Sequence, residues 1–249
     1  MSDKFVDFTD RTILITGAAS GMGEVSARSF AANGGAVVLA DINEKRAREI
    51  ADEITVKGGK AIAVKVDVTN YNEIAHAVEL GEQTFGSVDV TISFAGGEPA
   101  RMLQQTGEFA EQPVELIDWG LAINGRAPVY MARAVLPGMM ARKRGVIINI
   151  SSIDGVAGGA IVYSTAKSGL IGFTKSLANY AAPYGIRACC VAPGPVLTRP
   201  GMANMKTCLG RAAEPQEVVD LVMYLASDKA AFITGDTYLI DGGRNCLYK

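Results

Sequence analysis

Short runs rich in β-branched residues alternate with longer helical stretches throughout the sequence. The expected strands are residues 12–15, 36–40, 61–66, 88–93, 145–150, 186–191 and 236–240. The expected helices are residues 21–33, 44–57, 72–85, 114–121, 127–141, 160–182 and 215–226. Strands that alternate with helices build βαβ units, whose parallel sheet is covered by helices on both faces. The pattern therefore predicts a single three-layer α/β domain over residues 1–249, with a doubly wound sheet of about seven strands.

Composition and charge narrow the function classes. The 249 residues carry a net charge of −2, and no basic block favours nucleic acid as a partner. The first residues show no apolar signal core, and no run approaches the roughly 18 apolar residues of a membrane span. We therefore expect a cytoplasmic protein with no nucleic-acid partner and no membrane partner.

The cysteine and histidine content gives no support for a metal site. The four cysteines match no zinc or thioredoxin-type spacing, and His76 is the only histidine. Cys189 and Cys190 fall in an expected strand, where a small thiol packs well. We expect buried, reduced cysteines and no bound metal.

A glycine-rich turn, Thr16-Gly17-x-x-x-Gly21-x-Gly23, follows the first expected strand and opens the first expected helix. Three glycines permit a tight turn, close backbone approach to a phosphate and close helix–strand packing. The helix N-terminus offers free N–H groups and a partial positive charge to a pyrophosphate. This position in the sequence predicts a dinucleotide site to which Gly17, Ser20, Gly21, Met22 and Gly23 contribute.

Asp41 ends the second expected strand, 18 residues beyond Gly23. A carboxylate there can accept both hydroxyls of an adenosine ribose and would repel a 2′-phosphate, which favours NAD over NADP. The alternative role for Asp41 is a helix N-cap, for which Asn43 is also suited. Strand C-termini of open α/β sheets bind ligands, so the cofactor site is also expected to include Ile42, Asp67, Val68, Phe94, Ala95 and Gly96. Asp67 suits a cap or turn equally well.

Tyr163 and Lys167 are four residues apart in the expected helix 160–182, so they share one helix face. The reference pKa of a phenol is about 10, and a nearby ammonium favours the phenolate. Tyr163 is therefore a candidate general acid/base toward an alcohol or carbonyl oxygen. Ser152, just after the strand 145–150, is placed to hydrogen-bond the same oxygen. Taken alone, the Tyr-x-x-x-Lys spacing fits an exposed helical pair better.

Together, in their order and spacing, these motifs resemble the short-chain dehydrogenase/reductase family along almost the full length. The matching pieces are Thr16-Gly17-x-x-x-Gly21-x-Gly23, Asp67-Val68, Ala95-Gly96, Asn124, Ser152, Tyr163-x-x-x-Lys167 and Pro193-Gly194. The resemblance implies a Rossmann-type sheet and hydride transfer between a nicotinamide and an alcohol or carbonyl carbon.

The resemblance also implies a role for each residue of the site. Tyr163 would be the acid/base, Lys167 would lower its pKa and hold the nicotinamide ribose, and Ser152 would orient the substrate oxygen. Asn124 would hold a water that links Lys167 to solvent. The nicotinamide end would contact Pro193, Gly194, Val196 and Thr198. The structural alternatives are a helix kink at Asn124 and a plain turn at Pro193-Gly194.

Three features depart from the family pattern. Phe94 stands where the family usually has Asn before Ala-Gly, which bears on the geometry of that strand end. Ser152 and Tyr163 are 11 residues apart, a shorter gap than is usual, and Ser151 is the alternative serine. The run from Ser152 to Gly155 nevertheless fits the usual Ser-x-x-Gly. Residues 198–211 form a short substrate lid, which implies an open site or one closed by a neighbouring subunit.

The sequence thus predicts an NAD-dependent oxidoreductase that interconverts a secondary alcohol and a ketone. One alternative is an NADPH-dependent 3-oxoacyl-[acyl-carrier-protein] reductase, against which Asp41 and the lack of a basic residue in the glycine turn argue. The other is a non-catalytic dinucleotide-binding protein, against which the presence of Asn124, Ser152, Tyr163 and Lys167 together argues.

The substrate and assembly are less constrained. Asp154, with Glu98 and Arg101, is expected near the mouth of the site, which favours a polar substrate such as a polyol or sugar; alternatively these charges face solvent. The family resemblance implies a homotetramer or homodimer, with the Asn124 and Tyr163 helices forming one interface.

Overall fold

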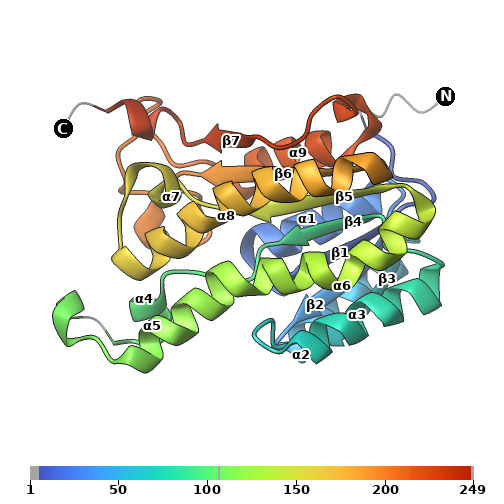
Figure 1. Ribbon diagram of the computed structural model, residues 1–249, viewed down its shortest axis with the longest axis horizontal. Coiled ribbons are helices and arrows are strands. Elements are labelled where there is room, and N and C mark those ends of the chain that lie inside the picture. The colour runs from blue at the N-terminus through green and yellow to red at the C-terminus, as the bar shows by residue number, and fades with distance from the viewer. Residues whose placement is uncertain (1–5, 106, 248–249) are drawn as a thin grey trace.

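The computed structural model describes residues 6–105 and 107–247, so the first five residues, whose sequence shows no signal core, lie outside the described part. Seven parallel strands form one sheet in the order β3-β2-β1-β4-β5-β6-β7 (Figure 1). Their bounds are β1 (Thr12–Thr16), β2 (Ala36–Asp41), β3 (Lys60–Lys65), β4 (Val90–Ser93), β5 (Gly145–Ile150), β6 (Ile186–Pro193) and β7 (Thr237–Ile240). The predicted Rossmann-type fold is confirmed.

Helices cover both faces of this sheet. One core cluster joins the strands to α1 (Gly21–Ala32), α2 (Glu44–Val56) and α9 (Pro215–Ala226). The other joins them to α3 (Tyr71–Phe85), α6 (Ala127–Arg142) and α8 (Ile161–Ala181). In Figure 1, α6 and α8 lie in front of the strands. Ile13 and Ile15 enter the first cluster and Leu14 the second, because successive strand side chains point to opposite faces.

Several short elements were not predicted, among them three near the cavities. These three are α4 (Pro99–Met102), α7 (Asp154–Ala157) and a π-helical turn (Ala122–Arg126) that joins α5 (Val114–Leu121) to α6. The first is fixed by its cap, because the Glu98 carboxylate accepts from the N–H groups of Ala100 and Arg101 at 3.0 and 2.7 Å. Such one-turn elements lack the apolar periodicity by which longer helices are predicted from sequence.

The strand order reverses between β1 and β4, which places the switch point of the sheet at the ends of these two strands. Cys189 and Cys190 in β6 are buried, as expected, whereas Cys208 and Cys246 are exposed. Among the described residues, no helix combines the length and apolarity required to cross a membrane.

Candidate active site

The glycine turn after β1 is packed so closely that side chains are excluded. Gly17 and Gly21 have φ angles of +68° and +52°, in the left-handed region that favours glycine. A Cβ on Gly17 would lie 2.7 Å from the nitrogen of Ala95, and one on Gly23 would lie 2.0 Å from the carbonyl oxygen of Gly17. The turn therefore keeps its backbone close to the N-terminus of α1, where N–H groups remain available for an anion.

Asp41, the last residue of β2, faces the same turn. One carboxylate oxygen accepts from the N–H of Ala19 at 2.9 Å, and the other accepts from the N–H of Asn43 at 2.8 Å. Asn43, rather than Asp41, caps α2 through a bond from the N–H of Arg46 at 3.2 Å. Asp41 thus positions the glycine turn and retains acceptor capacity at the cavity beside it.

Two adjoining cavities run along the carboxyl ends of the strands. The first, of about 320 Å³, is lined by every residue expected to bind the cofactor from the first four strand ends: Gly17, Ser20, Gly21, Met22, Gly23, Asp41, Ile42, Asp67, Val68, Phe94, Ala95 and Gly96. The second, of about 430 Å³, is lined by Ser152, Asp154, Tyr163, Lys167, Pro193, Gly194, Val196 and Thr198. Both share Ser20, Gly21, Met22, Phe94, Gly96 and Thr198, so they are continuous.

This arrangement fits a dinucleotide. The glycine turn would hold the pyrophosphate, because it leads into the N-terminus of α1, where Gly17 and Gly23 leave no room for a side chain. The Asp41 carboxylate borders the first cavity, where it would accept hydrogen bonds from the hydroxyls of an adenosine ribose. The second cavity would then receive the nicotinamide end together with the substrate.

The two serines after β5 have different partners. The Ser151 hydroxyl donates to the backbone carbonyl of Lys167 at 2.7 Å and is buried. The Ser152 hydroxyl accepts from the N–H of Asp154 at 3.1 Å, and it lies close enough to the Tyr163 phenol to favour the charged form of that phenol. Despite the short connection between them, Ser152 and Tyr163 therefore meet at the cavity, while Ser151 fastens α8 to the strand end.

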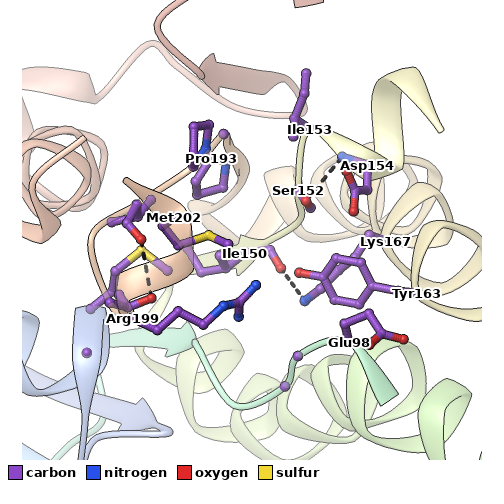
Figure 2. A pocket seen from close by; sticks show the side chains of 18 of the residues that line it. Glu98, Ile150, Ser152, Ile153, Asp154, Tyr163, Lys167, Pro193, Arg199 and Met202 are labelled. Carbon is purple, nitrogen blue, oxygen red and sulfur yellow. Dashed lines mark hydrogen bonds between the residues drawn. The ribbon is translucent and has the colours of Figure 1, made fainter. Parts of the chain in front are cut away.

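Tyr163 and Lys167 lie one turn apart on α8, beside Ser152 (Figure 2). The Lys167 ammonium lies 5.6 Å from the centroid of the Tyr163 ring and donates to the carbonyl of Ile150 at 2.7 Å. Burial raises the pKa of Tyr163, and Ser152 opposes this. The pKa of Tyr163 is therefore raised, whereas the family resemblance implied that it would be lowered. The effect of burial exceeds that of the contacts that favour the phenolate.

Lys167 is 4% exposed, and burial lowers its pKa from 10.5 to about 8. At a pH between these two pKa values, Lys167 is protonated in the unfolded chain but neutral in the folded chain. The unfolding free energy of the wild-type protein therefore rises with pH in this range. In Lys167→Met this gain is absent. Between pH 8 and 10, the unfolding free energy of wild type should therefore rise by on the order of 2 kcal/mol relative to that of the variant.

Urea unfolding across this pH range measures the difference, with Lys175→Met, at an exposed position of the same helix, as the control. A difference between Lys167→Met and wild type that does not change with pH would contradict the assignment of a depressed pKa to Lys167.

Asn124 is fully buried in the π-helical turn between α5 and α6. Its Oδ1 accepts from the N–H of Gly97 at 2.9 Å, and its Nδ2 donates to the carbonyls of Gly97 and Gly120 at 2.8 and 3.0 Å. Both amide protons are thus used, and one acceptor site remains on Oδ1. The amide fastens the segment after β4 to this turn, a role beyond the helix kink considered from the sequence.

The end of β4 keeps a regular geometry although Phe94 replaces the usual asparagine. The Phe94 N–H donates to the carbonyl of Thr16 at 3.2 Å, and the Ala95 N–H reaches the Thr16 hydroxyl at 3.4 Å.

Asp67 uses one carboxylate oxygen in a turn, accepting from the N–H and hydroxyl of Thr69 at 2.9 and 2.7 Å. The turn role considered for Asp67 is therefore present, although the residue also borders the first cavity.

The cavity residues missed from the sequence include three from the segment expected to form a lid. Arg199, Met202 and Met205 all line the second cavity. The position of Arg199 directly after Thr198 was the signal that could have found it. Glu98 and Arg101 line the same cavity, as does Asp154.

A doubly wound parallel sheet with a glycine turn at its switch point defines a Rossmann-type dinucleotide-binding protein. The family model described as "Enoyl-(Acyl carrier protein) reductase" matches residues 17–245. The chain is 35% identical to cyclohexanol dehydrogenase of Acinetobacter sp. (strain SE19), over 97% of this chain and 96% of that protein. It is 37% identical to cis-4-hydroxycyclohexanecarboxylate dehydrogenase of Sinomonas cyclohexanicum, over 95% and 97%.

A solved structure agrees with these relatives. The crystal structure of a short-chain type dehydrogenase/reductase from Mycobacterium marinum superposes with a TM-score of 0.90 at 29% identity, covering 97% of each chain. The protein therefore belongs to the short-chain dehydrogenase/reductase family, a family of NAD(P)-dependent oxidoreductases, which confirms the resemblance found in the sequence.

Proposed function

We propose that this protein is an NAD-dependent dehydrogenase that interconverts a secondary alcohol and a ketone. The observation that carries the proposal is that Ser152 and Tyr163 both line the second cavity, together with the buried Lys167. Two hydroxyl groups that meet at a cavity are suited to hold one alcohol or carbonyl oxygen between them. The names of the two relatives, which both denote dehydrogenases of ring alcohols, support this reaction class.

In the proposed mechanism, Ser152 donates a hydrogen bond to the substrate oxygen and so orients the reacting carbon. Tyr163, as phenolate, accepts the hydroxyl proton during oxidation; as phenol, it donates a proton to the carbonyl oxygen during reduction. The bound nicotinamide supplies the hydride chemistry. The Lys167 ammonium, held by the Ile150 carbonyl, favours the phenolate once the cavity is filled and offers donors to the nicotinamide ribose.

We also propose a path by which the proton leaves. Asn124 retains one acceptor site on Oδ1, and a Cβ on Gly96 would lie 2.5 Å from this oxygen and 3.7 Å from the Lys167 nitrogen. The amide oxygen and the ammonium therefore flank the same glycine. A water held there by Asn124 would accept from Lys167 and pass its proton toward solvent.

The segment 198–211 is proposed to act as the substrate lid of this single domain, because Arg199, Met202 and Met205 cover the second cavity. The assembly is proposed to be a homotetramer or homodimer. Exposed apolar side chains on the helices of Asn124 and Tyr163 support a shared interface there: Leu121 is 36% exposed, Val129 40% and Ile161 53%.

The test is oxidation of a panel of secondary alcohols with NAD and with NADP, followed by the absorbance of the reduced nicotinamide. The panel includes cyclohexanol, 4-hydroxycyclohexanecarboxylate, polyols, hydroxysteroids and 3-hydroxyacyl thioesters. We expect turnover with ring alcohols, and a kcat/KM at least about 10-fold higher with NAD, because Asp41 would repel a 2′-phosphate.

Asp41→Ser is the matched variant for the coenzyme preference. It removes the negative charge and keeps a small hydrogen-bonding side chain, so the preference for NAD should shrink toward equality. Tight NADH binding without turnover of any alcohol would favour a non-catalytic dinucleotide-binding protein. A preference for NADP with turnover of 3-hydroxyacyl thioesters would favour the acyl-carrier-protein reductase.

A further inference from the structure

Two arginines from different elements border the second cavity near Tyr163. Arg101 lies in α4, and Arg199 is the second residue of the segment 198–211. Figure 2 shows the Arg199 side chain reaching across the cavity, with its guanidinium toward Tyr163 and Lys167. Both arginines favour the charged form of the Tyr163 phenol, and each therefore lies within electrostatic range of the reacting oxygen. Burial lowers the pKa of Arg199, and Arg101 adds to this, as expected of two like charges near each other.

Neither guanidinium has a close acidic partner. Within residues 6–105 and 107–247, no carboxylate oxygen lies within 4.0 Å of either group. Arg211, at the other end of the same segment, shows the contrast, because it binds both oxygens of Glu217 at 2.6 and 2.7 Å. The two arginines at the cavity thus retain donors that a bidentate anion would satisfy.

The acidic residues of this cavity form no ion pair with either arginine within the described part of the chain. Both oxygens of Glu98 cap α4, so its charge reaches Arg199 only over a longer distance. The carboxylate of Asp154 lies against Gly159, where a Cβ would stand 2.6 Å from its carboxyl carbon. Burial raises the pKa of Asp154, and Glu98 adds to this. The positive charge of the two arginines therefore remains available to a ligand.

Part of the remaining cavity wall is apolar. Ile153, Met202 and Met205 line it, and methionine adapts its shape to different carbon skeletons. A cavity of about 430 Å³ suits a small molecule rather than a long chain. The site therefore combines one alcohol-binding end, an apolar middle and a pair of unpaired guanidinium groups.

We propose that Arg199, assisted by Arg101, binds a carboxylate of the substrate, and that the substrate is a secondary alcohol with an apolar skeleton and one such acidic group. This inference rests on the proposed dehydrogenase function, and it selects a hydroxy acid over the polyol or sugar expected from the sequence. Because Arg199 lies on the segment 198–211, the same ion pair would draw this segment over the bound substrate.

The test compares hydroxycyclohexanecarboxylate with its methyl ester, which keeps the ring and the alcohol but removes the charge. For wild type, we expect kcat/KM to be about 10- to 100-fold higher for the acid, as is typical of a charge-assisted pair. Arg199→Gln should lower kcat/KM for the acid much more than for the ester and so remove most of this preference, while Arg199→Lys should keep part of it. Arg133→Gln, at an exposed position of α6 away from the cavity, is the control.

A second readout does not depend on turnover. Cyclohexanecarboxylate cannot react, and its Kd for the enzyme–NADH complex, measured by calorimetry, should rise about 10-fold or more in Arg199→Gln. An unchanged Kd, or equal kcat/KM for acid and ester in wild type, overturns the inference while leaving the dehydrogenase function intact. A loss of NADH affinity in Arg199→Gln also overturns it, because the arginine would then bind a cofactor phosphate. If no alcohol is oxidised but the carboxylate binds through Arg199, the proposed function fails and the anion site stands.

Discussion

Tyr163→Phe is expected to lower kcat by about 10²- to 10⁴-fold, the contribution usual for a general acid/base. The variant keeps the ring that packs against Lys167 but lacks the hydroxyl that meets Ser152. Neither the glycine turn nor Asp41 contacts this hydroxyl, so the affinity for NADH should stay within about twofold of wild type. A large fall in kcat with unchanged coenzyme binding is what separates a proton-transfer role from a structural one.

Tyr180→Phe is the matched control, because Tyr180 lies on the same helix and is 57% exposed. Stopped-flow oxidation of the best alcohol of the panel gives kcat, and quenching of NADH fluorescence gives the coenzyme Kd. If Tyr163→Phe retained more than about a tenth of wild-type kcat, proton transfer through this phenol would be refuted. If it lost NADH affinity instead, the residue would belong to the coenzyme site alone.

The fold could be predicted because it depends on local signals repeated many times. Each of the seven strands agrees with its predicted range to within two residues. Parallel strands buried on both faces are continuous apolar runs, and their helices carry long apolar stripes, so each element is signalled independently of its neighbours. The glycine turn could be predicted for a related reason: Gly17 and Gly23 mark positions where backbone meets backbone.

The candidate site was predictable only in part. The residue types Ser152, Tyr163 and Lys167 were evident from spacing, but the structure shows that burial governs the pKa values of the last two. Burial at a site depends on how separate elements pack, which local spacing does not encode. Arg199 was missed for the same reason, because whether a lid arginine faces solvent or a cavity is decided by the path of the whole segment.

Gly23→Ala is expected to lower the unfolding free energy by about 3 kcal/mol, the upper part of the usual range for overpacking. A Cβ at this position would stand 2.0 Å from the carbonyl oxygen of Gly17 and 2.8 Å from its carbonyl carbon. These are backbone atoms, so no rotamer change can relieve the overlap. The turn must move as a whole, and Gly17 itself is held by a 3.0 Å hydrogen bond to the carbonyl of Ala40.

The same displacement should weaken coenzyme binding. The N–H groups of the turn and the Asp41 carboxylate are joined through Ala19, so a shift of the turn misplaces both ends of the expected dinucleotide site. We expect the Kd for NADH to rise at least about 10-fold in Gly23→Ala. Gly107→Ala is the control, because a Cβ on Gly107 would meet nothing within 4 Å and this exposed position should change stability by less than about 0.5 kcal/mol. Urea unfolding gives the unfolding free energy of the two variants, and NADH titration gives their coenzyme Kd. If Gly23→Ala changed both quantities as little as Gly107→Ala, the turn would tolerate a side chain, and close backbone packing would not shape the coenzyme site.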